Sequence, residues 1–301
     1  MFNRVLVGVD GRQGGRDAIA LATRLTTRAR HLTLAHVYAG HGDPPVRGYD
    51  DDETTQITRA RFLLQAASGH GRIDAELRWT GAKSPGRGLH QLAETVNADL
   101  LVVGSTRRGP VGRVLLGDDT RDALDGAPCA VAIAPAGYAA QAAAIRNIGV
   151  GYDGSPGSER ALLAARALAA ELDAKLAALE VVDFPSYTLS GPLAGDSTMV
   201  GHLVDDARER VAALGGLEPH ATAGQPAEEL GLWSDSLDLL VVGSHGFGGV
   251  GRLVHGSTSR ELTRRAQCPL LALTRARRAE ARPPDPAERL ELATPGARGR
   301  R

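Results

Sequence analysis

A glycine-rich segment at residues 243–258 carries the residues of this sequence best suited to binding a phosphate chain. It reads Gly-Ser-His-Gly-Phe-Gly-Gly-Val-Gly-Arg-Leu-Val-His-Gly-Ser-Thr and directly follows the apolar run at 239–242. Glycine lets backbone N–H groups approach an anion closely, and a helix N-terminus adds partial positive charge. The segment therefore predicts a phosphate-binding loop between a buried strand and a helix. The alternative is a loop that serves only as a tight turn.

Four side chains in or near this segment have two interpretations each. Ser257 and Thr258 can face a phosphate, or they can cap the next helix, because residues 258–261 spell a capping box. Asp153, at the end of an earlier strand, can contact a ligand or organise the Asp-Gly-Ser-Pro turn. His245 can donate a hydrogen bond to a phosphate or simply lie on the surface. Spacing alone leaves these alternatives open.

The sequence contains the same unit twice. Residues 4–11, 34–37 and 99–104 match three later blocks in the same order, and Cys129 matches Cys268 at the end of the series. Four matched blocks in one order indicate a duplication. The later blocks are 147–154, 178–181 and 238–243.

Each copy alternates short apolar runs with helical patterns. Such runs predict parallel strands covered by helices on both faces, and Ser155-Pro156 marks a helix start. The expected fold class is α/β: two tandem Rossmann-like or flavodoxin-like domains, each a five-stranded parallel sheet. Ligands of such sheets lie at the carboxyl ends of the strands. The expected strands are 5–9, 32–37, 75–79, 100–103 and 131–134, then 148–151, 176–182, 217–221, 239–242 and 270–273.

Composition divides the chain further and excludes several function classes. We expect one repeat at 1–136, an Ala-rich linker at 137–145, a second repeat at 146–274 and a disordered tail at 275–301. The formal net charge is zero and aromatic residues make up only 4% of the chain, so nothing favours nucleic acid as a partner. No segment has the pattern of a membrane helix, and the expected protein is soluble and cytoplasmic.

The two cysteines and the scattered histidines do not suggest a reactive centre. Cys129 and Cys268 have no metal-ligand spacing and are expected to be small buried residues. No metal site is expected from the histidines either. The chain has no Gly-x4-Gly-Lys-(Ser/Thr) loop and no kinase-type catalytic loop, so no catalytic residue is assigned.

Together these residues resemble the universal stress protein family. That family carries Gly-x2-Gly-x9-Gly-(Ser/Thr) after its fourth strand, and the glycine-rich segment at 243–258 matches this spacing. The resemblance extends from residue 4 to about 274. It implies that ATP or a related adenine nucleotide, with or without Mg²⁺, binds at this loop. The residues it places around the nucleotide are Gly151, Asp153, Val181, Val242, Gly243, His245, Gly246, Gly256, Ser257 and Thr258.

The first copy departs from the family pattern at two positions. Arg107 stands where the second copy has Gly246, and Asp118 stands where it has Ser257. A long side chain blocks the backbone approach, and a carboxylate near a partly buried phosphate costs on the order of kilocalories per mole. We therefore expect ATP mainly in the second repeat, and at most an adenosine-sized pocket in the first.

The resemblance also bears on assembly and role. Family members of single-repeat size commonly pair through their last strands, so a tandem chain is expected to dock its repeats as a pseudo-dimer. A homodimer of such chains and an unidentified protein partner stay open. The expected role is that of a nucleotide-responsive stress or regulatory protein. The alternatives are a slow ATPase or nucleotidyl transferase using the same pocket, and an interaction scaffold that binds no nucleotide.

Overall fold

The computed structural model describes most of both repeats. The described residues are 2–26, 31–39, 53–71, 74–105, 123–141, 143–183, 197–243, 262 and 264–273. Most of the glycine-rich segment and the expected tail lie outside these ranges. None of the helices within them is long and apolar enough to cross a membrane.

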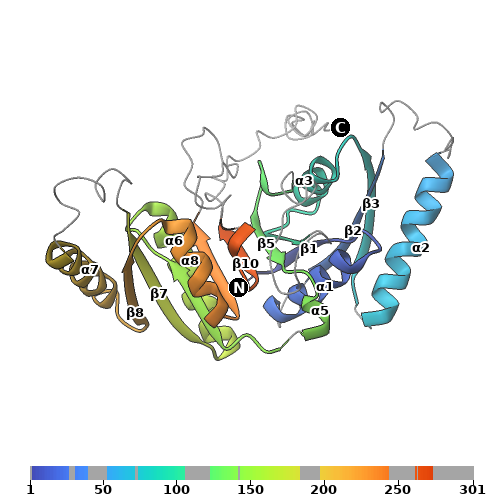
Figure 1. Cartoon of the computed structure of the whole chain (residues 1–301). Coiled ribbons are helices and arrows are strands. Elements are labelled where there is room, and N and C mark those ends of the chain that lie inside the picture. The colour runs from blue at the N-terminus through green and yellow to red at the C-terminus, as the bar shows by residue number, and fades with distance from the viewer. Residues whose placement is uncertain are drawn as a thin grey trace, which may run out of the picture.

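A single ten-stranded sheet runs through both repeats in the order β3-β2-β1-β4-β5-β10-β9-β6-β7-β8 (Figure 1). Within each repeat all neighbouring strands are parallel. Two five-stranded parallel sheets were expected, and both are confirmed, with strand bounds that differ by a few residues. The strands are β1 (Arg4–Gly8), β2 (His31–Ala39), β3 (Glu76–Ala82), β4 (Leu100–Gly104), β5 (Ala130–Ala134), β6 (Asn147–Gly151), β7 (Lys175–Val182), β8 (Glu218–Ala223), β9 (Leu239–Gly243) and β10 (Leu270–Leu273).

The two repeats are joined by their last strands. β5 and β10 pair antiparallel, with Leu271 opposite Ala132, at the centre of the sheet (Figure 1). Every residue of β5 is buried, and its pairing with β4 on one side and β10 on the other gives its backbone groups hydrogen-bond partners. The expected pseudo-dimer docking is therefore confirmed, as a covalently linked pair.

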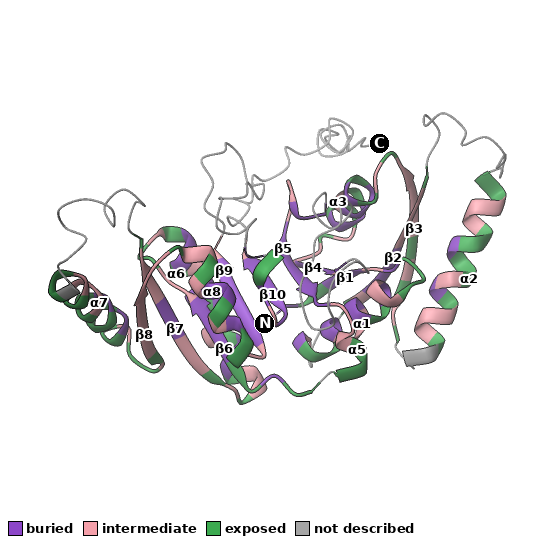
Figure 2. Cartoon of the chain, in the orientation of Figure 1, coloured by how far each residue is buried: buried purple, intermediate pink, exposed green. Residues whose placement is uncertain are grey.

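Helices cover both faces of the sheet. One face carries α1 (Gln13–Leu25), α2 (Glu53–Gly71), α6 (Pro156–Leu172) and α7 (Ser197–Ala212), and the other carries α3 (Pro85–Thr95) and α8 (Pro226–Trp233). Figure 2 shows that burial concentrates in the central strands, whereas α2 and α7 present exposed faces at the two ends. Each of the two core clusters draws residues from both repeats, so the halves share their hydrophobic cores.

Proline at the first helical position starts α3, α6 and α8, where its missing N–H costs no hydrogen bond. The side chain of Ser155 caps α6 by accepting a hydrogen bond from the backbone N–H of Ser158 (3.2 Å). This agrees with the helix start predicted from Ser155-Pro156.

The connector between the repeats contains a short helix that the composition did not predict. This helix, α5 (Tyr138–Gln141), packs against α1. The carboxylate of Asp17 on α1, fully buried, accepts hydrogen bonds from the backbone N–H groups of Gly137 (2.9 Å) and Ala139 (2.8 Å). A buried carboxylate satisfied in this way fixes the connector on the helix.

Candidate functional site

The predicted site residues that the structure describes lie together at one edge of the sheet. β9, β6 and β7 are adjacent, and their carboxyl ends carry Val242 with Gly243, Gly151 and Val181 respectively. Asp153 follows two residues after β6 and is exposed. The other predicted residues lie outside the described ranges and stay predictions; they are His245, Gly246, Gly256, Ser257 and Thr258.

The first glycine of the motif touches the beginning of α6. A Cβ built on Gly243 would lie 2.3 Å from the carbonyl carbon and oxygen of Gly157 and 2.8 Å from the backbone nitrogen of Ser158. These are backbone atoms, which cannot move aside without shifting the helix. Gly243 therefore lets the first turn of α6 pack directly on the end of β9. It brings a helix N-terminus, which favours anions, to the place where the loop begins.

The first repeat makes the same close contact between strand and helix. A Cβ on Gly104 would lie 2.1 Å from the backbone oxygen of Gly14 on α1. Because this glycine is needed in both copies, including the one with the altered loop, it belongs to the fold as well as to the motif. Its presence alone does not distinguish a working site from a degenerate one.

Two buried apolar side chains pack beside Gly151. A Cβ on Gly151 would lie 3.1 Å from a methyl carbon of Leu230 and 3.5 Å from one of Val242. Both side chains are buried, and Val181 packs against the same cluster. Sequence reasoning found the valines but missed Leu230 of α8. Leu89 packs in the same way against Gly8 in the first repeat, so this contact is common to both copies.

The aspartates that follow the first strand of each repeat make different contacts. In the first repeat, Asp10 accepts hydrogen bonds from the backbone N–H groups of Arg12 and Gly15 (both 2.9 Å), the second of which lies in the first turn of α1. In the second, Ser155 caps the helix, and Asp153 accepts from the backbone N–H of Ser155 (3.0 Å). Asp153 therefore does organise the turn before α6, as one of its two interpretations predicted. The N-terminus of α6 is capped by Ser155 instead.

Two ionisable groups close in sequence to the site residues each have a side-chain partner. The hydroxyl of Tyr152 donates a 2.6 Å hydrogen bond to Glu159, and this bond and partial burial raise the pKa of Tyr152 to about 12. Glu180 on β7 forms an ion pair with Arg210 of α7. The phenol therefore stays neutral at physiological pH, and the Glu180 carboxylate is partly neutralised by its guanidinium partner.

Neither cysteine has the properties of a reactive residue. Cys129 and Cys268 are free thiols and both are buried. Burial is the main reason that the pKa of each thiol is raised to about 12. The thiolate, which is the nucleophile, is therefore disfavoured at neutral pH. Within the described ranges, no cluster of three or more His, Cys, Asp or Glu residues could hold a metal ion.

Comparison with known proteins places this arrangement in a family. The chain matches the universal stress protein family twice, at residues 1–135 and 144–274. A universal stress protein of Mycobacterium tuberculosis is 29% identical over 292 residues, covering 89% of this chain and 95% of the relative. A universal stress protein structure from Archaeoglobus fulgidus covers 91% of this chain and 98% of its own, with a TM-score of 0.63 at 17% identity.

A shorter solved structure is described as a universal stress protein in complex with cAMP. It is 26% identical, covers 40% of this chain and 86% of its own, and has a TM-score of 0.29. The family matches span both repeats, which the sheet joins through their last strands. The chain belongs to the universal stress protein family, as a tandem of two family domains.

Proposed function

We propose that this protein binds ATP, or a related adenine nucleotide, in its second repeat and acts as a nucleotide-responsive regulatory protein. The supporting observation is that Asp153, Val181 and Val242 lie together at one edge of the sheet. At the same edge, Gly243 is in close contact with Gly157 at the start of α6. In an open parallel sheet this edge, outside the carboxyl ends of the strands, is where ligands bind.

Each part of the site suits a different part of a nucleotide. The partly buried side chain of Val181, packed against the cluster that contains Val242 and Leu230, suits contact with an adenine ring. The exposed carboxylate of Asp153 suits a ribose hydroxyl, because a carboxylate accepts hydrogen bonds. The N-terminus of α6 and the predicted glycine-rich loop suit the phosphates.

The first repeat keeps the framework but not the loop chemistry. Gly104, Asp10 and Gly8 hold positions equivalent to those of the second repeat. The sequence changes at Arg107 and Asp118 introduce bulk and negative charge where the phosphates would lie. We therefore propose one ATP per chain, bound in the second repeat. The domain division proposed with it is 1–136, a connector at 137–145, 146–274 and a tail at 275–301.

Isothermal titration of nucleotide-free protein with ATP and with cAMP tests the proposal. We expect saturable ATP binding with a stoichiometry near one per chain. The double variant Gly246→Arg/Ser257→Asp copies the first repeat into the second and should weaken ATP binding at least about tenfold, a loss of roughly 1.4 kcal/mol. The thermal unfolding of this variant should match that of the unchanged protein, so that weakened binding is not a result of misfolding.

A matched control uses the first repeat. The variant Arg107→Gly/Asp118→Ser restores the family spacing there, and it should leave the affinity of the second-repeat site unchanged. Absence of ATP binding in the unchanged chain contradicts the proposal. Unweakened binding in the Gly246→Arg/Ser257→Asp variant contradicts the placement of the site in the second repeat. Measuring phosphate release during the same titration separates binding from turnover.

A further inference from the structure

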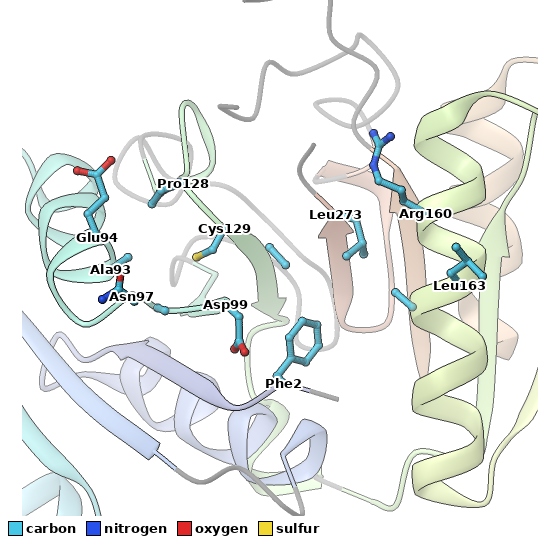
Figure 3. A pocket seen from close by; sticks show the side chains of 13 residues that line it. Phe2, Ala93, Glu94, Asn97, Asp99, Pro128, Cys129, Arg160, Leu163 and Leu273 are labelled. Carbon is cyan, nitrogen blue, oxygen red and sulfur yellow. The ribbon is translucent and has the colours of Figure 1, made fainter. Parts of the chain in front are cut away.

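A cavity of about 600 Å³ lies at the seam between the two repeats (Figure 3). One wall belongs to the first repeat and the other to α6 and the end of β10. Figure 3 shows Arg160 and Leu163 on α6, across this space from the first-repeat residues that line it. The residues that line the cavity include Phe2, Asp99, Cys129, Arg160, Leu163 and Leu273.

The equivalent place on the second repeat is covered by the connector. There, a cavity of only about 150 Å³ lies between connector residues of 135–145 and the pair Asp238 and Cys268. Asp238 and Cys268 are the counterparts of Asp99 and Cys129 in the duplicated sequence. The two cavities are therefore equivalent places in the two repeats. The connector fills one of them, and no part of the chain that the structure describes fills the other.

The helix residue that anchors the connector is replaced by one of opposite charge. The alignment of residues 4–11 with 147–154 continues to place Asp17 of α1 opposite Arg160 of α6. Asp17 accepts the backbone N–H groups of Gly137 and Ala139, whereas a guanidinium only donates. The segment that leaves β10 therefore cannot dock on α6 in the way that the connector docks on α1.

Arg160 requires an acceptor. Its Nε is buried and has no hydrogen-bond partner among the described residues. A desolvated guanidinium donor without an acceptor is costly, and a carboxylate is the acceptor that suits it best. One turn further along α6, the apolar side chain of Leu163 borders the cavity and is 66% exposed. An occupant that carries both carboxylate and apolar side chains therefore fits this cavity best.

We propose that residues 285–292 of this chain occupy the cavity, with a carboxylate on Arg160 and with Leu290 and Leu292 against Leu163. This stretch reads Asp-Pro-Ala-Glu-Arg-Leu-Glu-Leu. It belongs to the chain that continues from Leu273, which itself lines the cavity. The occupant is therefore tethered beside its site, at a high effective concentration.

The charge distribution of residues 274–301 selects this stretch over its neighbours. Arg275, Arg277, Arg278 and Arg282 precede it, and Arg298, Arg300 and Arg301 follow it, all of which would repel Arg160. The stretch itself carries three carboxylates against one arginine, Arg289, and its two leucines are the only large apolar side chains in 274–301. It also begins Asp-Pro-Ala-Glu, the spacing of a helix start, as suits a counterpart of α5.

Amide hydrogen exchange on the full-length protein, read by mass spectrometry, tests this docking. We expect peptides covering 285–292 to exchange at least about tenfold more slowly than peptides covering 293–301. The variant Arg160→Glu should abolish that protection, and Arg160→Lys should keep part of it. Arg208→Glu on α7 is the matched control, since it makes the same charge change on another exposed helix of this repeat, and it should leave the protection intact.

The native thiols provide a second measurement that does not depend on a change in α6. The triple variant Asp285→Asn/Glu288→Gln/Glu291→Gln should uncover the cavity and speed the alkylation of Cys129 severalfold. Cys268, beside the connector-covered cavity, is the internal reference and should keep its rate.

Uniformly fast exchange across 274–301 in the unchanged protein overturns the proposal. Protection that persists in both Arg160→Glu and the triple variant also overturns it, because the contact then lies elsewhere. Protection of Cys129 that depends on protein concentration but not on the triple variant identifies a second copy of the chain as the occupant and likewise overturns it.

Discussion

Replacing Gly243 by alanine tests whether the motif's first glycine is required by the fold. The new Cβ would lie 2.3 Å from two backbone atoms of Gly157. Real Cβ atoms essentially never approach other heavy atoms closer than 3.0 Å, so α6 and β9 must separate. Overpacking a well-packed core costs about 1–3 kcal/mol, and a clash with backbone belongs at the upper end of that range.

We therefore expect Gly243→Ala to lower the free energy of unfolding by about 3 kcal/mol. With a urea m-value of about 2 kcal/mol per molar, the midpoint should fall by about 1.5 M. The assay is urea denaturation followed by far-ultraviolet circular dichroism, in the absence of nucleotide. Gly104→Ala, with its Cβ 2.1 Å from the backbone oxygen of Gly14, should lose a similar amount.

Gly201 provides the matched control. It lies inside α7, and a Cβ there would meet nothing within 4 Å. Gly201→Ala should therefore raise the free energy of unfolding by about 0.5–1 kcal/mol, the usual gain in a helix. If Gly243→Ala unfolds at the same midpoint as the unchanged protein, the backbone contact does not constrain the fold and the reasoning is refuted.

Two further predictions concern the buried ionisable groups. Burial raises the pKa of Cys129 and Cys268 from 9.0 to about 12, so their contribution to stability is complete below pH 9 and is lost as the pH rises toward 12. Each thiol should make the free energy of unfolding fall by up to about 1.4 kcal/mol per pH unit in this range. The Cys129→Ala/Cys268→Ala variant should show a smaller fall when the free energy of unfolding is measured by urea denaturation at each pH. An unchanged slope would show that other groups control it. Separately, Asp17→Ala removes the buried acceptor of Gly137 and Ala139 and should cost about 2–4 kcal/mol in the same assay, and a loss under 1 kcal/mol would contradict its role as the connector's anchor.

Most of the sheet was predictable from the sequence because the signal for each strand is local. Runs such as 100–103 and 239–242 are apolar at every position, which marks strands buried on both faces. Strand ends were less predictable. β3 continues past Trp79 to Ala82 because it pairs with β2 as far as Ala39, a tertiary constraint.

The connector shows where local reasoning fails. An Ala-rich stretch indicates a linker, yet α5 forms there because Asp17, far away in the sequence, accepts its N-terminal N–H groups. The site shows a related limit. The motif predicts that Gly243 makes room for a ligand, and the structure shows that this glycine also makes room for α6. The spacing of glycines in a sequence shows where there is no room for a side chain. It does not show which neighbouring group occupies that room.

The antiparallel pairing of β5 with β10 also determines which surfaces a partner can reach. It inverts one repeat relative to the other, so the carboxyl ends of the strands in the two repeats point in opposite directions. The carboxyl ends of β9 and β4 therefore lie at opposite edges of the sheet, and a partner that contacts one of them does not meet the other. Substitutions at one of these edges can therefore accumulate without changing the described residues at the other, although both edges belong to repeats that share their hydrophobic cores.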